Sequence, residues 1–90
     1  MPRHLIEEKQ YTEQLNALRV NWKRFDDAFM TLEPAIRLVP DIFPQVPGTL
    51  LRRVRLVGFE GVPPLSIYFA VKGDTAHLVA AELIPDEDGW

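Results

Sequence analysis

The amino-acid sequence predicts an α+β fold in which a long N-terminal helix or helical hairpin packs on a three-stranded antiparallel β-meander. Three observations predict it. Apolar residues recur with helical spacing in the first part of the chain, prolines and glycines cluster in the middle, and apolar and polar residues then alternate as in strands. With 90 residues and one such succession, the chain is expected to form a single domain over residues 1–90.

The helical prediction rests on apolar residues whose spacings alternate between 4 and 3, the rhythm of a helix that buries one stripe. Between Arg3 and Glu33 there is neither glycine nor proline, so a helix over roughly residues 5–32 is expected. The same pattern fits two helices with a bend between Asn16 and Asn21, where helix propensity dips. Pro34 then begins a short helical continuation. The repeat consists of Tyr11, Leu15, Leu18, Trp22, Phe25, Phe29, Leu32 and Ile36.

The second half of the chain predicts a connector and then strands. Pro40 to Gly48 is rich in proline, which fixes φ and lacks an N–H, so an extended connector is expected there. Gly73-Asp74 has the residues of a two-residue hairpin turn. The acidic tail at residues 85–90 is expected to be mobile. The expected strands are Leu50 to Val57, Leu65 to Lys72 and Thr75 to Ile84.

Composition narrows the function classes. A formal net charge of −3 argues against attraction of the whole protein to nucleic acid. The absence of cysteine excludes disulfides, thiolate metal sites and cysteine nucleophiles. No glycine-rich phosphate loop or converging metal-ligand set is visible, so neither a cofactor nor a metal is expected. The N-terminus lacks a signal-peptide core and no apolar run reaches membrane-spanning length, so we expect a cytoplasmic protein without a membrane partner.

Short motifs on the predicted strands carry a family resemblance. A basic-x-basic motif, Arg53-Val54-Arg55, lies on the first strand, and an aromatic motif, Ile67-Tyr68-Phe69-Ala70-Val71, lies on the second. Together with the helical segment and the proline-glycine connector, they resemble the RelE/ParE toxin superfamily over roughly residues 15–84. The family has a first strand before its helices, for which this chain offers the fragment Arg3 to Ile6.

The resemblance implies the toxin component of a toxin–antitoxin system, which inhibits growth by acting on messenger RNA at the ribosome or on gyrase. Its expected partner is a cognate antitoxin-like protein or a second copy of the chain. The RNA-cleaving members are metal-independent endonucleases whose basic side chains hold the scissile phosphate. The implied catalytic residues are Arg53, Arg55 and Tyr68. For the arginines the alternative is a solvated strand face, and for Tyr68 a packing role in the sheet.

Two departures from the family pattern bear on the activity. The family often has an arginine at the start of the strand where this chain has Ser66, and its basic or histidine-tyrosine ending is replaced here by the acidic run from Glu82 to Asp88. These departures favour a gyrase-directed member, or an inactive member that binds a partner, over ribosome-dependent RNA cleavage.

A second function class is a non-catalytic interaction or dimerisation module. The apolar stripe is longer than a three-stranded sheet can cover, so Trp22, Phe25 and Phe29 are predicted to bind a partner, together with a free sheet edge. The alternative is that the same residues form the core. His77 is expected on the strand face shared by Thr75, Val79 and Ala81, as a structural or surface histidine.

Overall fold

The computed structural model describes residues 3–85 and confirms the α+β class. Three α-helices pack with a four-stranded mixed sheet. The acidic tail expected to be mobile lies outside the described residues from Asp86 onward. The elements are β1 (His4–Glu7), α1 (Lys9–Ala17), α2 (Trp22–Phe29), α3 (Glu33–Leu38), the 3-10 helix η1 (Pro40–Ile42), β2 (Arg52–Leu56), β3 (Leu65–Lys72) and β4 (Thr75–Leu83).

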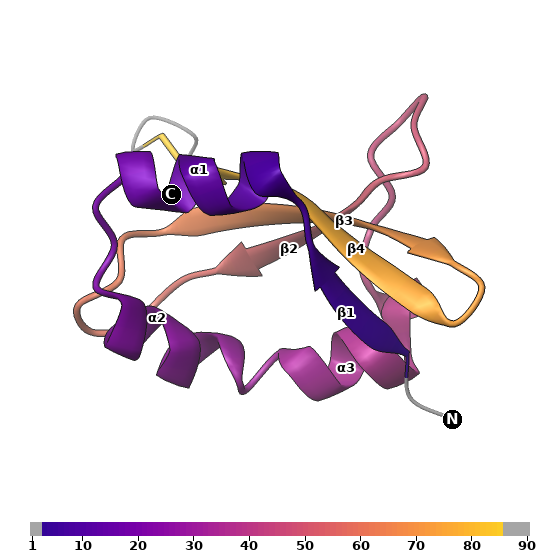
Figure 1. The fold of residues 1–90 in the computed structure, drawn as a ribbon, viewed down its shortest axis with the longest axis horizontal. Coiled ribbons are helices and arrows are strands. Elements are labelled where there is room, and N and C mark those ends of the chain that lie inside the picture. Colours follow the sequence, from indigo (N-terminus) through magenta and orange to yellow (C-terminus); the bar gives the residue numbers. More distant parts are fainter. Residues whose placement is uncertain (1–2, 86–90) are drawn as a thin grey trace.

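The sheet has one strand more than the sequence predicts. Its order is β1-β4-β3-β2, and β2, β3 and β4 are antiparallel neighbours. β1 adds to the edge of β4 in parallel, from His4 opposite Thr75 to Glu7 opposite Leu78 (Figure 1). The prediction of a three-stranded antiparallel meander is therefore wrong. β1 is only four residues long and pairs with the far end of the chain, so it leaves no local pattern that marks it as a strand.

The helical stripe is divided among separate helices instead of forming one rod over residues 5–32. α1 ends at Ala17, and Arg19 then adopts a left-handed φ of 56°. Asn21 starts α2 as its N-cap, because its Oδ1 accepts a hydrogen bond from the Arg24 amide at 3.1 Å. The break falls between Asn16 and Asn21, which is the alternative that the propensity dip indicated. It lets each helix turn its own part of the stripe toward the sheet.

One hydrophobic cluster joins the helices to the sheet. Phe43 anchors the proline-rich connector to this cluster by packing edge-on against Phe69, with ring centroids 5.7 Å apart. At the other end, the Arg3 amide and Nη1 donate to the Arg37 carbonyl at 3.3 and 3.1 Å, which ties β1 to the end of α3. The buried residues at the centre include Tyr11, Leu15, Phe25, Ile36, Val54, Leu56, Leu65, Ile67, Phe69 and Leu78.

A β-bulge in β4 decides which side chains face outward. Phe69 lies opposite Leu78 but Tyr68 lies opposite Ala80, so Val79 is an extra residue in the ladder. Because side chains alternate with a period of two, the extra residue reverses the faces of everything after it. Ala81 is consequently buried in the core, and the prediction that it shares a face with His77 is wrong.

Candidate functional site

The candidate site begins with two arginines on the outer face of the sheet, the face turned away from the core. Along β2, exposed Arg53 and Arg55 alternate with buried Val54 and Leu56, so the prediction that the two arginines share one face is confirmed. Arg52 points the other way: its Nη1 donates to the Phe43 carbonyl at 2.7 Å. Arg52 therefore fastens the connector, and Arg53 and Arg55 form the outward cationic pair.

Arg53 and Tyr68 are brought together across the ladder. They lie directly opposite each other on β2 and β3, and both line a cavity of about 170 Å³. The connector forms the rest of the wall, and the Arg53 amide donates to the Pro44 carbonyl at 2.9 Å, which holds the connector beside β2. The remaining lining residues are Pro44, Gln45, Val46 and Pro47. This cavity is therefore lined by both Arg53 and Tyr68, two of the residues that the family resemblance implies are catalytic.

Glu82 is the third polar side chain of the site, beside Arg53 and Tyr68. The Tyr68 hydroxyl donates to Glu82 Oε1 at 2.6 Å, a short hydrogen bond to a charged acceptor. Partial burial of the phenol, and secondarily the Glu82 carboxylate, raise the pKa of Tyr68, while Ser66 and Arg53 act in the opposite direction. Tyr68 is therefore a protonated hydrogen-bond donor at neutral pH. Sequence reasoning missed Glu82, because only the bulge at Val79 places it on this face.

The outer face thus presents two cross-strand rows. One row runs from Arg53 to Tyr68, and the other runs from Arg55 through Ser66 to Glu82. Guanidinium groups stabilise negative charge on phosphate oxygens, a carboxylate can accept a proton, and a phenol with a raised pKa can donate one. The arrangement has the parts for binding an anion and transferring protons beside it.

His77 belongs to the far side of this face. Its Nδ1 lies 3.9 Å from Glu8 Oε2, and its Nε2 lies 3.2 Å from Thr75 Oγ1. Within residues 3–85, no group of three or more histidine, aspartate or glutamate side chains is arranged to hold a metal ion. The histidine is half-buried on an interior strand, with Ile6 of β1 on one side and Ala70 of β3 on the other.

The residues predicted to bind a partner differ widely in exposure. Phe25 is 2% exposed and belongs to the core. Phe29 is half-buried and stacks on Phe25, with ring centroids 5.8 Å apart. Trp22 is 37% exposed, packs edge-on against Phe25, and donates its indole N–H to Asn16 Oδ1 at 3.1 Å. Of these three aromatic residues, Trp22 therefore offers the most accessible surface.

Comparisons with protein-family models and with curated proteins found no match for this chain. Within the described part of the chain, no helix is long and apolar enough to cross a membrane. The functional interpretation therefore rests on the topology and on the side chains of the outer face.

Proposed function

We propose that this chain is a RelE/ParE-like toxin that inhibits growth in the cytoplasm and whose outer sheet face cleaves RNA without a metal. The sequence departures favour a gyrase-directed member, but Glu82 and Tyr68 supply acid–base groups beside the arginines, and this favours RNA cleavage. The observation that carries the proposal is the meeting of Arg53 and Tyr68 in one cavity, with Tyr68 hydrogen-bonded to Glu82. The topology supports it as well. β1 precedes the helices, in the position where the toxin family has its first strand. A cognate antitoxin-like protein is the partner that this function requires.

The side chains can divide the reaction among themselves. Glu82 accepts the proton of a ribose 2′-hydroxyl, and the resulting alkoxide attacks the adjacent phosphorus. Arg53 and Arg55 stabilise the negative charge that builds on the phosphate oxygens. Tyr68, whose pKa is raised, donates its proton to the departing 5′-oxygen. The products are a 2′,3′-cyclic phosphate and a 5′-hydroxyl. In the free protein Tyr68 and Glu82 are hydrogen-bonded to each other, and contacts with the bound substrate replace this hydrogen bond.

Expression of the protein in a bacterial host tests the proposal. We expect growth arrest, with messenger RNA fragments that end in 2′,3′-cyclic phosphate. The Arg53→Ala, Arg55→Ala double variant should relieve the arrest while remaining folded. Tyr68→Phe and Glu82→Gln should each slow cleavage by about 100-fold or more, the usual contribution of a general acid or base. Lys23→Ala, which removes an exposed cation on α2, is the matched control and should remain toxic.

The assay also separates the two targets of the family. Arrest with intact RNA and impaired DNA supercoiling would replace RNA cleavage by inhibition of gyrase. If growth, RNA and gyrase activity are all unchanged at high expression, the chain is not an active toxin.

An interaction module is the second candidate, favoured by apolar side chains exposed where α3 meets η1. Leu38 is 58% exposed and Ile42 is 66% exposed. This function predicts an oligomer in solution that Leu38→Glu, Ile42→Glu or Trp22→Glu weakens without unfolding the protein. Analytical ultracentrifugation measures it, and a monomer at every concentration would rule out self-association.

A further inference from the structure

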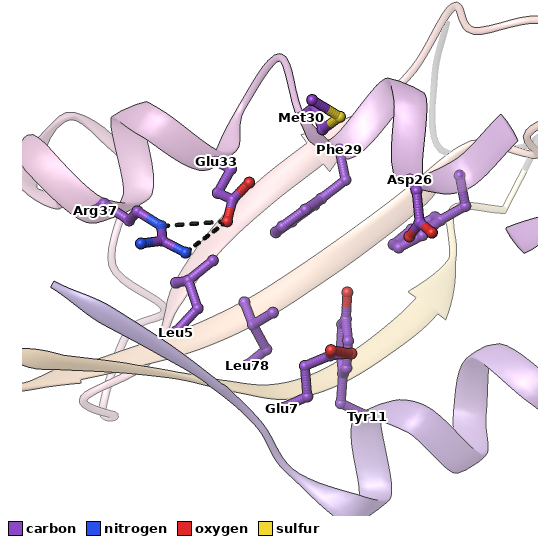
Figure 2. A pocket seen from close by; sticks show the side chains of 10 residues that line it. Leu5, Glu7, Tyr11, Asp26, Phe29, Met30, Glu33, Arg37 and Leu78 are labelled. Atoms are coloured by element: carbon purple, nitrogen blue, oxygen red, sulfur yellow. Dashed lines mark hydrogen bonds and ion pairs between the residues drawn. The ribbon is translucent and has the colours of Figure 1, made fainter. Parts of the chain in front are cut away.

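A second cavity, of about 350 Å³, lies on the opposite face of the sheet from the arginines. It opens between β1, the start of α1, α2 and α3, and Leu78 of β4 forms part of its wall (Figure 2). An ion pair closes one end, because Arg37 Nη2 and Nε lie 2.8 and 3.2 Å from Glu33 Oε1. The volume falls in the range of about 300–1,000 Å³ that small-molecule sites occupy.

Tyr11 points its hydroxyl into this cavity. The residue is 1% exposed, and Figure 2 shows the phenol standing upright between Glu7 and Asp26 with its oxygen toward the open space. No residue within 3–85 forms a hydrogen bond with that hydroxyl. Burial, and then the charges of Glu7 and Asp26, raise the pKa of Tyr11, so the group is a neutral phenol. The hydroxyl therefore faces the open space of the cavity as an unpaired donor and acceptor, available to a ligand bound there.

The charge of the cavity is negative. Glu33 is neutralised by Arg37, but the carboxylates of Glu7 and Asp26 form no ion pair or hydrogen bond with the described part of the chain. Both are close enough to Tyr11 to affect its titration. Two acidic groups and a hydroxyl acceptor on one cavity favour a cation. The described residues do not arrange three ligands for a metal ion, so the cation that fits is organic.

The rest of the wall is apolar and partly aromatic. Phe25 and Phe29 stack with an interplanar angle of 13°, and Leu5 and Leu78 line the side nearer β1. Aromatic faces attract cations, and aliphatic side chains favour a hydrocarbon stem. We propose that this cavity binds a small organic cation, a guanidinium or primary ammonium group on a short apolar stem, with its charge near Glu7, Asp26 and the Tyr11 hydroxyl. The proposal is independent of the chemistry on the outer face.

Titration with a matched set of probes tests the proposal. Amide NMR spectra are recorded with n-butylguanidinium, with its uncharged isostere n-butylurea, and with butyrate. We expect n-butylguanidinium alone to shift the amides around Glu7, Tyr11 and Asp26, with an affinity that falls as salt rises. Equal binding of n-butylurea would show an apolar cavity without selectivity for charge. No shifts at millimolar n-butylguanidinium would overturn the proposal.

The chain offers neighbouring carboxylates as controls. Asp26→Asn and Glu7→Gln should each raise the Kd for n-butylguanidinium about tenfold, as for the loss of one hydrogen bond to a charged group. Asp27→Asn and Glu8→Gln remove equal charges from residues that do not line the cavity, and they should leave the Kd within about twofold. Tyr11→Phe should weaken binding while keeping the fold. If the control variants weaken binding as much as Asp26→Asn, the effect is net charge and the site is wrong.

Discussion

The two faces of the sheet differ sharply although the same strands build both. On the inner face Ile67 and Phe69 are fully buried beneath the helices, whereas on the outer face Tyr68 is partly exposed and hydrogen-bonded to Glu82. Alternate residues of β3 therefore serve different ends. Burial of apolar side chains on the inner face stabilises the fold. The polar side chains on the outer face are not required for packing, so they can serve in binding or catalysis. Substitutions of the buried apolar residues should therefore lower the free energy of unfolding, whereas substitutions of the outer polar residues should change it little.

Inserting one alanine between Ala80 and Ala81 should produce the largest effect, because it shifts every later residue of β4 by one position against β3. The shift would turn Glu82 toward the core and Ala81 outward, and burying an unpaired carboxylate is expensive. We expect a loss of about 5 kcal/mol, most of the free energy of unfolding of a small domain. Urea unfolding measures it. Deleting Val79 instead removes the bulge but leaves Ala81 opposite Ile67 and Glu82 opposite Ser66, so that variant should remain folded. Equal stability of the insertion variant would show that burial does not set the register.

Phe69→Ala should have the next largest effect. The ring is fully buried and packs edge-on against Phe43, so its removal leaves a cavity and loosens the connector. We expect a loss of about 3–4 kcal/mol in the free energy of unfolding. Lys72→Ala, at the exposed end of the same strand, should change stability by less than about 0.5 kcal/mol. Similar losses for the two variants would contradict the separation of the faces.

Alkaline pH should destabilise the protein through its buried phenol. The pKa of Tyr11 is raised above its ordinary value of 10.0, so above that pH the unfolded chain loses a proton that the folded chain retains. This contribution to stability is complete below pH 10.0 and is lost as pH rises through the folded-state pKa. Urea unfolding across this range should show a decline that is smaller in Tyr11→Phe. An unchanged pH profile in that variant would place the cause elsewhere.

Tyr68→Phe should have the smallest effect on stability. It removes the hydrogen bond to Glu82 at 2.6 Å, but the site is partly exposed and water can replace the donor. We expect a loss below about 1 kcal/mol, measured by urea unfolding. A loss as large as that of Phe69→Ala would mean that the outer face also holds the fold together.

Local patterns predicted much of this structure because they depend on neighbouring residues. The periodicity of Leu65 to Lys72 and the turn at Gly73-Asp74 predicted the last hairpin, and the alternation around Val54 predicted that Arg53 and Arg55 share a face. The dip in helix propensity indicated where the stripe breaks. Each of these features is encoded by residues within a few positions of one another.

The remaining features depend on contacts between distant segments. β1 is a strand because the edge of β4 offers it backbone partners, and four residues carry too little periodicity to reveal this. The extra residue Val79 is a mismatch between β3 and β4, so Glu82 could not be assigned to the outer face from β4 alone.

The sequence by itself therefore determined the class of fold, the hairpin and the pair of arginines, since these follow from spacing along the chain. Only the tertiary structure decided that Tyr68 and Glu82 bond to each other and that Glu7, Tyr11 and Asp26 surround one cavity. The physical reason is that both groupings need strand register and helix packing. Those are set by burial over the whole core and not by any local sequence preference.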